Sequence, residues 1–187
     1  MRTFIAVKPP AHILAAMTRA AAPLQKAISG GVKWVPAEQI HLTLKFLGEF
    51  SAAHVDPLRE KLAAECGRIG AIETATTSIG AFPPRGNPRV IWFGIEASAA
   101  LTRLARMIED TCADLDYPRE KRPFTPHFTI GRVQRYAGNS EVQSIRQALQ
   151  VFPDPPSDNF RLDRLHFIES TLSPAGPQYR DVFTIAL

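Results

Sequence analysis

Apolar residues follow two different spacings along this chain, and the two spacings alternate. In some segments they recur every three or four positions, which predicts helices that bury one side. The predicted helices are Ile13–Ile28, Ser51–Ile69, Ser98–Leu115 and Ser140–Leu149. Between them lie short β-prone runs, and the predicted strands are Thr3–Val7, His41–Leu47, Ile72–Ile79, Arg89–Ile95, His127–Val133, Phe160–Ile168 and Asp181–Ala186.

Local signals set the ends of these elements. Ser51 and Ser98 stand where a side-chain oxygen would cap the first turn of a helix, and the Gly30-Gly31 pair ends the first helical pattern. The Pro-rich stretches 82–88 and 152–159 predict loops. Both halves of the chain run in the order helix, His-containing strand, helix, strand. This order suggests a duplicated architecture, while the lack of a short tandem repeat argues against a solenoid.

Composition describes an ordinary globular protein with a mild preference for polyanions. The chain has 187 residues, 45% of them hydrophobic and 21% charged, with a formal net charge of +4. That length suits a single domain, and that charge alone is too small to indicate nucleic acid. No apolar run approaches the length of a membrane span, and the N-terminal residues do not resemble a signal peptide. Cys66 and Cys112 fall on predicted helices, so we expect them to be buried free thiols, which indicates a reducing, cytoplasmic location. The sequence shows no heptad repeat, and we therefore expect a monomer.

One short motif occurs twice in this chain. His41-Leu42-Thr43-Leu44 returns as His127-Phe128-Thr129-Ile130, 86 residues further on. Successive side chains of a strand point to opposite faces, so the His and Thr of each copy share one face while the apolar residues point to the other.

Two imidazoles and two hydroxyls in one cleft would suit phosphodiester hydrolysis. One His takes a proton from water, the other donates one to the leaving oxygen, and the Thr hydroxyls bind the non-bridging oxygens. A metal hydrolase is the rival chemistry, but neither copy has a second His or a carboxylate at the spacing of a zinc site. A lone His-x-Thr is usually structural, and we leave the unpaired His12, His54 and His166 as surface or packing residues.

The flanks of both motifs resemble a known family. The runs His-Leu-Thr-Leu-Lys-Phe-Leu-Gly from His41 and Pro-His-Phe-Thr-Ile-Gly-Arg up to Arg132 are similar to those of the two-histidine phosphoesterase superfamily, and most of all to its RNA 2′,3′-cyclic phosphodiesterases, the LigT-like or 2′-5′ RNA ligase proteins. The start Arg2-Thr3-Phe4-Ile5-Ala6-Val7 fits as well. The resemblance therefore covers essentially the whole chain.

That resemblance implies a fold and an activity. The fold would be α+β, with residues 1–187 forming one bilobal domain of two pseudo-symmetric lobes, each an antiparallel sheet backed by helices and facing a central cleft. The activity would be metal-independent hydrolysis of RNA 2′,3′-cyclic phosphate ends to a 2′-phosphomonoester, without a cofactor. His41 would be the proton donor and His127 the acceptor, although the residues alone do not say which is which. Relatives with these motifs also act on small cyclic nucleotides or join RNA through 2′-5′ bonds, and a nucleotide- or RNA-binding module with little turnover stays open as an alternative.

Several neighbours could bind substrate. Thr43 and Thr129 are the expected phosphate ligands, whereas Phe46 and Arg132 each lie five positions after a motif His and by simple alternation would point away from the site. A β-bulge near Lys45 or Gly131 would redirect them, so that Arg132 could bind phosphate and Phe46 could stack a base; otherwise Phe46 belongs to the core. By simple alternation Lys45 would point to the same face as His41, toward the cleft, but a lysine in such a position is more often a surface charge. Further arginines could line a path for RNA, and these are Arg85, Arg89, Arg119 and Arg122.

Overall fold

Helices and strands alternate along the chain as the apolar pattern predicts. The computed structural model describes residues 1–174 and 176–187. The strands are β1 (Arg2–Val7), β2 (Val32–Trp34), β3 (Leu42–Glu49), β4 (Ile72–Phe82), β5 (Val90–Ile95), β6 (His127–Val133), β7 (Asn159–Leu162), β8 (Arg164–Ser173) and β9 (Gly176–Ala186). The helices are α1 (Ala11–Ala27), α2 (Val55–Ile69), α3 (Ala99–Ala113) and α4 (Asn139–Val151), with 3-10 turns at Ala37–Gln39 and Ala52–His54.

The strands form two separate antiparallel sheets. One has the order β3-β1-β8-β9 and the other the order β2-β6-β5-β4-β7. The first motif lies at the start of β3 and the second in β6, so we call these the His41 sheet and the His127 sheet. The α+β fold of two sheets with one motif in each, which the resemblance implied, is confirmed.

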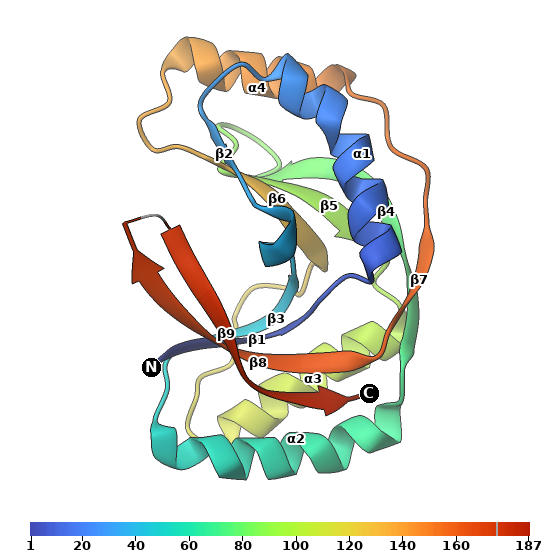
Figure 1. Cartoon of the computed structure of the whole chain (residues 1–187), viewed down its shortest axis with the longest axis vertical. Helices are drawn as coiled ribbons and strands as arrows, with labels where there is room; N and C mark the ends of the chain where they lie inside the picture. The colour runs from blue at the N-terminus through green and yellow to red at the C-terminus, as the bar shows by residue number, and fades with distance from the viewer. Residues whose placement is uncertain (175) are drawn as a thin grey trace.

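Each sheet is backed by two helices on the side away from the other sheet (Figure 1). α2 and α3 pack against one another and against the His41 sheet, through β9 and β3 respectively, whereas α1 and α4 cover the His127 sheet. The lobes are not successive halves of the chain, because α1 leaves β1 of one lobe to cover the other, and α3 crosses in the opposite direction. Each lobe therefore depends on both halves of the sequence.

The helices form where the apolar stripes predict them. On α1, Ile13, Met17 and Leu24 are buried, and on α3 the Ser98 hydroxyl accepts a hydrogen bond from the Leu101 amide at 3.3 Å. Ser51 differs from the prediction, because its hydroxyl accepts from the Ala53 amide and so caps the 3-10 turn that precedes α2.

The structure adds one strand that was not predicted and changes the bounds of several others. β2 was not predicted, since three residues are too short for a visible alternation. The predicted strand Phe160–Ile168 divides at Asp163 into β7, which pairs with β4, and β8, which pairs with β1 and β9. β9 begins at Gly176 and β4 extends to Phe82, because backbone pairing of β9 with β8 and of β4 with β5 continues beyond the segments with visible alternation.

Both cysteines are free and buried, as predicted. Burial raises the pKa of the Cys66 thiol to about 11 and that of the Cys112 thiol to about 12. Such thiols are unreactive at neutral pH because the thiolate is the nucleophile. In the described part of the chain, no helix has both the length and the apolar character that a membrane span requires.

Candidate active site

The strand that carries the first motif contains a β-bulge directly after Thr43. Ala6 of β1 pairs with Thr43, but Ile5, which precedes Ala6 in β1, pairs with Lys45, so Leu44 is an extra residue of β3. After such a bulge the alternation of side chains is inverted. Phe46 consequently lies on the His41 face, where it is 66% exposed and its ring centroid is 6.0 Å from that of Phe4. The core placement of Phe46 that simple alternation predicted is wrong.

The same bulge turns Lys45 into the interior. Its side chain is buried, and its Nζ donates to Glu109 Oε2 at 2.6 Å and to the Pro118 carbonyl oxygen at 2.8 Å. Glu109 Oε2 also accepts from the Glu120 amide at 3.1 Å. Lys45 is therefore neither a surface charge nor a cleft residue. It ties the strand of the first motif to the segment that leads into the second.

β6 has an equivalent bulge. Trp92 of β5 pairs with Thr129, whereas Ile91 pairs with Gly131, so Ile130 is the extra residue. His127, Thr129 and Arg132 consequently share one face, and the Arg132 side chain is exposed there. A Cβ atom on Gly131 would lie 2.9 Å from Trp34 Cε3, so the close approach of β2 requires glycine at this position.

The two histidines are held in the same way. His41 Nδ1 donates to the Gln39 carbonyl oxygen and His127 Nδ1 to the Thr125 carbonyl oxygen, both at 2.7 Å. Because a carbonyl oxygen only accepts, each neutral ring carries its proton on Nδ1 and keeps a lone pair on Nε2. Both imidazoles are thus prepared to exchange a proton at Nε2.

Aromatic rings fix the orientation of His41. Phe4 stacks on it with ring centroids 4.7 Å apart, and Tyr179 meets it edge-on at 5.4 Å. A pocket of about 300 Å³ opens beside His41, and it is lined by Lys8, Glu38, Gln39, Ile40, His41, Ile168, Gln178 and Tyr179. Phe4 and Tyr179 could not be predicted from the motif, since they come from β1 and β9 and no spacing relates them to His41.

The field of the site favours neutral imidazoles in the absence of an anion. Burial lowers the pKa of His41 to about 4, aided by the positive charges of Arg132 and Lys8 and by His127 when that ring is protonated, and opposed by the hydrogen bond to the Gln39 backbone. Burial and the Arg132 charge also lower the pKa of His127. Arg132 and His127 belong to one sheet and His41 to the other, so the two motif faces are close enough for their charges to interact.

Thr43 and Thr129 lie half-buried on the same faces as the histidines. Within residues 1–174 and 176–187 their hydroxyls make no hydrogen bond to protein atoms, which leaves them free to bind a ligand oxygen. In the same ranges, no group of three or more His, Cys, Asp or Glu side chains is placed to hold a metal ion. His12 is exposed, His54 meets the Tyr117 hydroxyl at 3.2 Å, and His166 is buried with Nδ1 3.3 Å from Asp181.

The predicted path of arginines is only partly available. Arg119 pairs with Asp110, and Arg122 pairs with Glu120, so the charge of both is compensated. Arg85 and Arg89 are exposed on the loop after β4, and neither has an ion pair with a described residue. Any electrostatic attraction of RNA by this set therefore rests on the second pair.

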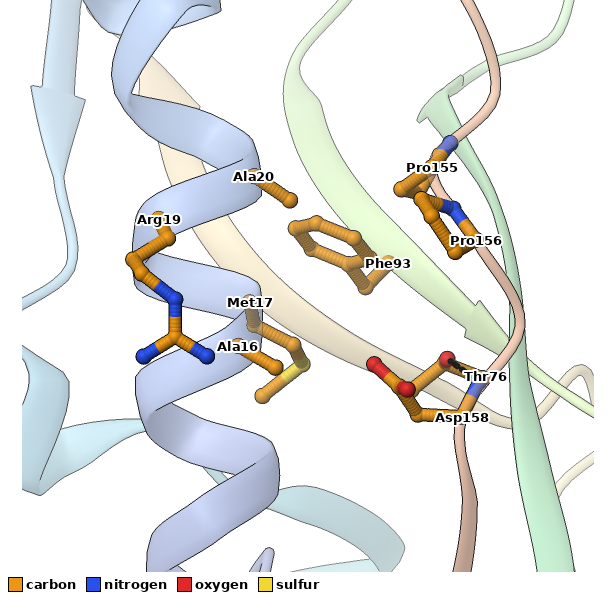
Figure 2. Close-up of a pocket in the computed structure, with 9 residues that line it drawn as sticks. All are labelled: Ala16, Met17, Arg19, Ala20, Thr76, Phe93, Pro155, Pro156 and Asp158. Atoms are coloured by element: carbon orange, nitrogen blue, oxygen red, sulfur yellow. Dashed lines mark hydrogen bonds between the residues drawn. The ribbon is translucent and has the colours of Figure 1, made fainter.

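A larger pocket lies elsewhere. It has a volume of about 370 Å³ between α1 and the segment before β7, and Figure 2 shows Met17 and Phe93 on its wall with Pro155 and Pro156 opposite α1. Phe93 belongs to the face of β5 opposite to Trp92, so this pocket opens on the helix-covered side of the His127 sheet. Neither motif histidine lines it, and we place the candidate site at the histidines.

Comparisons with known proteins point to one family. A family model described as the 2′-5′ RNA ligase superfamily matches residues 9–173. An RNA 2′,3′-cyclic phosphodiesterase of Archaeoglobus fulgidus is 34% identical over 186 residues, which are 97% of this chain and 98% of that protein. The structure of TT0787 of Thermus thermophilus has a TM-score of 0.77 at 28% identity and covers 100% of this chain and 98% of its own. The structure of E. coli LigT complexed with 3′-AMP has a TM-score of 0.74 at 25% identity and covers 100% and 97%.

Proposed function

The chain belongs to the 2′-5′ RNA ligase superfamily, and on that premise we propose that it hydrolyses 2′,3′-cyclic phosphate ends of RNA to a 2′-phosphomonoester. It is an RNA 2′,3′-cyclic phosphodiesterase, like its relative in Archaeoglobus fulgidus. One observation carries the proposal: each motif His donates Nδ1–H to the carbonyl oxygen two residues before it, so two Nε2 atoms are free for proton transfer. A protein that only bound nucleotides would not need two imidazoles prepared in the same way.

The reaction that we propose uses one His on each side of phosphorus. His127 Nε2 takes a proton from water while the water oxygen forms its bond to phosphorus. The bond from phosphorus to the ribose 3′ oxygen breaks, and His41 Nε2 donates its proton to that oxygen, leaving a 3′-hydroxyl and a 2′-phosphate. Thr43 and Thr129 donate hydrogen bonds to the non-bridging oxygens, where negative charge develops. A 5′-hydroxyl of RNA in the place of water would give the 2′-5′ joining reaction.

His41 acquires its proton together with the substrate. In the free site its pKa of about 4 leaves it neutral at pH 7, largely through burial and the nearby cations. A cyclic phosphodiester carries one negative charge, which offsets the field of Arg132 and Lys8 and stabilises the protonated ring. The lowered pKa thus makes the protonation of the donor depend on the bound phosphate.

Arg132 and Phe46 complete the proposed substrate site. The guanidinium of Arg132 has a fork of donors that suits phosphate oxygens, and the exposed ring of Phe46 can stack on a base. Binding of nucleotides is supported by the complex of E. coli LigT with 3′-AMP. Small cyclic nucleotides are the second substrate class that the site suits, and a monomer in the cytoplasm remains our proposal for the form of the protein.

The direct test is turnover of a short RNA that ends in a 2′,3′-cyclic phosphate, with a strong chelator present. We expect wild type to form a 2′-phosphate end, and His41→Ala and His127→Ala to be folded but at least a hundredfold slower. Turnover that the chelator abolishes, or that survives both substitutions, would contradict the two-histidine mechanism. Tight binding of the RNA by folded wild type without any product would favour a binding module.

The roles of the two histidines are separable with a modified substrate. If sulfur replaces the 3′ leaving oxygen, the thiolate can depart without a proton donor. His41→Ala should then recover most of the wild-type rate, whereas His127→Ala should stay slow because water activation is still required. Recovery of the His127 variant instead would exchange the two roles.

A further inference from the structure

Beside His127, an indole ring lies flat on the His127 sheet. Trp92 pairs with Gly80 of β4 and with Thr129 of β6, so its side chain lies on the Thr129 face. The ring occupies the space above the two neighbouring glycines: a Cβ atom on Gly80 would overlap its six-membered ring, and one on Gly94 would lie 3.2 Å from Cζ3. Glycine at position 80 thus allows the ring to lie against the backbone, whereas at Gly94 the nearest atom to such a Cβ is the Thr77 hydroxyl oxygen.

Phe82 extends this surface toward the catalytic histidine. Its ring centroid is 5.1 Å from that of Trp92, with 37° between the planes, and it meets His127 edge-on at 5.0 Å. We call Phe82 and Trp92 the aromatic platform. Both residues are half-buried.

The platform is not part of the hydrophobic core. The core side of β5 is filled by Ile91, Phe93 and Ile95, which are all buried. Trp92 alternates with them and lies on the opposite face, together with a motif His and Thr. A large aromatic residue that is only partly buried beside a phosphodiester site, with its ring over Gly80, is placed to contact substrate rather than to fill the interior.

We propose that the aromatic platform stacks a nucleobase of the RNA end whose phosphate lies between the two histidines. The inference rests on the proposed function and extends it by one binding subsite. A flat ring offers a π-face that any base can use, and the buried Nε1 of Trp92, which has no acceptor among the described residues, is not available to read base edges. Stacking here is therefore independent of base identity.

The charge around the platform fits this occupant. Arg85 and Arg89 are exposed on the loop that follows Phe82, and Arg132 lies on the same face of the sheet. Cations around an aromatic surface are the arrangement that holds a single strand, whose backbone is anionic while its bases are apolar on both faces. Phe46 belongs to the other sheet, so the platform would receive a different base from the one we assign to Phe46.

Fluorescence provides the first test, since the chain has only two tryptophans. In Trp34→Phe, Trp92 is the only indole, and saturation with adenosine 2′-monophosphate should quench its emission. Ribose 5-phosphate has no base, and once calorimetry shows that it is bound, it should leave the Trp92 emission unchanged. Trp92→Phe, which retains Trp34, is the matched control and should show no quenching. Bound nucleotide without a change in Trp92 emission would overturn the proposal, and if Trp34→Phe does not fold, wild type compared with Trp92→Phe gives the same answer.

Kinetics provide the second test. Two RNA ends with 2′,3′-cyclic phosphate are compared, identical except that the terminal nucleotide of one is abasic. Trp92→Leu keeps an apolar side chain but removes the π-face, and it should lower kcat/KM for the complete end about tenfold or more, mainly through KM. It should change turnover of the abasic end by less than twofold. An equal loss for both ends would show a structural role and overturn the proposal. If folded wild type turns over neither end, the proposed function fails, and the fluorescence test still decides on the platform.

Discussion

Removal of the His41 imidazole should make the protein more resistant to acid. The His41 ring is neutral and buried at pH 7, and the folded state binds its proton only near pH 4, whereas an unfolded His binds it near 6.5. As the pH falls through this window the unfolded chain takes up a proton that the folded chain refuses, so acid favours unfolding. His41→Asn removes that proton site while its side-chain amide can still donate to the Gln39 carbonyl oxygen.

The magnitude follows from the two pKa values. Between pH 7 and pH 5 the proton binding of His41 should lower the free energy of unfolding by about 2 kcal/mol, and below pH 4 the loss approaches about 3 kcal/mol. The pKa values of His127 and His166 are also lowered, so wild type will lose more than this in total. The difference between wild type and His41→Asn isolates the single group.

Urea unfolding at several pH values between 7 and 4.5, in a buffer without phosphate or sulfate, measures that difference. Wild type should lose about 2 kcal/mol relative to His41→Asn by pH 5, and His12→Asn is a control for the loss of an exposed imidazole. A difference that stays constant within about 0.5 kcal/mol across the range would refute the reasoning. Saturating inorganic phosphate should shrink the difference, because a bound anion raises the pKa of His41.

Three further predictions concern residues around the histidines. Lys45→Met should lower the free energy of unfolding by about 3 kcal/mol because Glu109 loses its partner, and Lys45→Met/Glu109→Leu should recover part of this in urea unfolding; a single variant as stable as wild type would contradict the buried pair. Arg132→Gln should weaken inorganic phosphate binding about tenfold or more in calorimetry, and equal affinity would remove Arg132 from the phosphate site. Phe46→Ala should raise KM for RNA ends several-fold at unchanged melting temperature, since the ring is exposed, and an unchanged KM would exclude base contact.

The elements that sequence analysis predicted best are those whose periodicity reflects one buried side. β6 has the predicted bounds, and α1 and α3 each bury one apolar side, as the spacing of their apolar residues predicts. Long-range pairing left no such signal. The division of the predicted strand Phe160–Ile168 depends on which sheet each part joins, and β2 exists because its backbone pairs with β6. The exchange of α1 and α3 between the lobes is likewise a property of packing that no local pattern records.

The two motif histidines could be singled out from the sequence because the motif repeats, whereas their surroundings could not. His41 and His127 were found from matched spacing in two places. Phe4 and Tyr179 come from other strands, and their contact with His41 is set by the pairing of β1 with β3 and of β8 with β9. Lys45 was misplaced because alternation assumes a regular strand, and the bulge at Leu44 reverses it.

The two bulges explain why the fourth residue of each motif belongs to the site as much as the His and the Thr. Leu44 and Ile130 each follow the motif Thr, and each is the extra residue of its ladder. Without the bulges, the residue five positions after each His would point into the lobe behind it; with them, Phe46 and Arg132 join the faces that carry the histidines. An apolar residue at the fourth position can bury its side chain while the backbone accommodates the extra length. The same local irregularity in both strands therefore brings an exposed ring onto the face of His41 and a cation onto the face of His127.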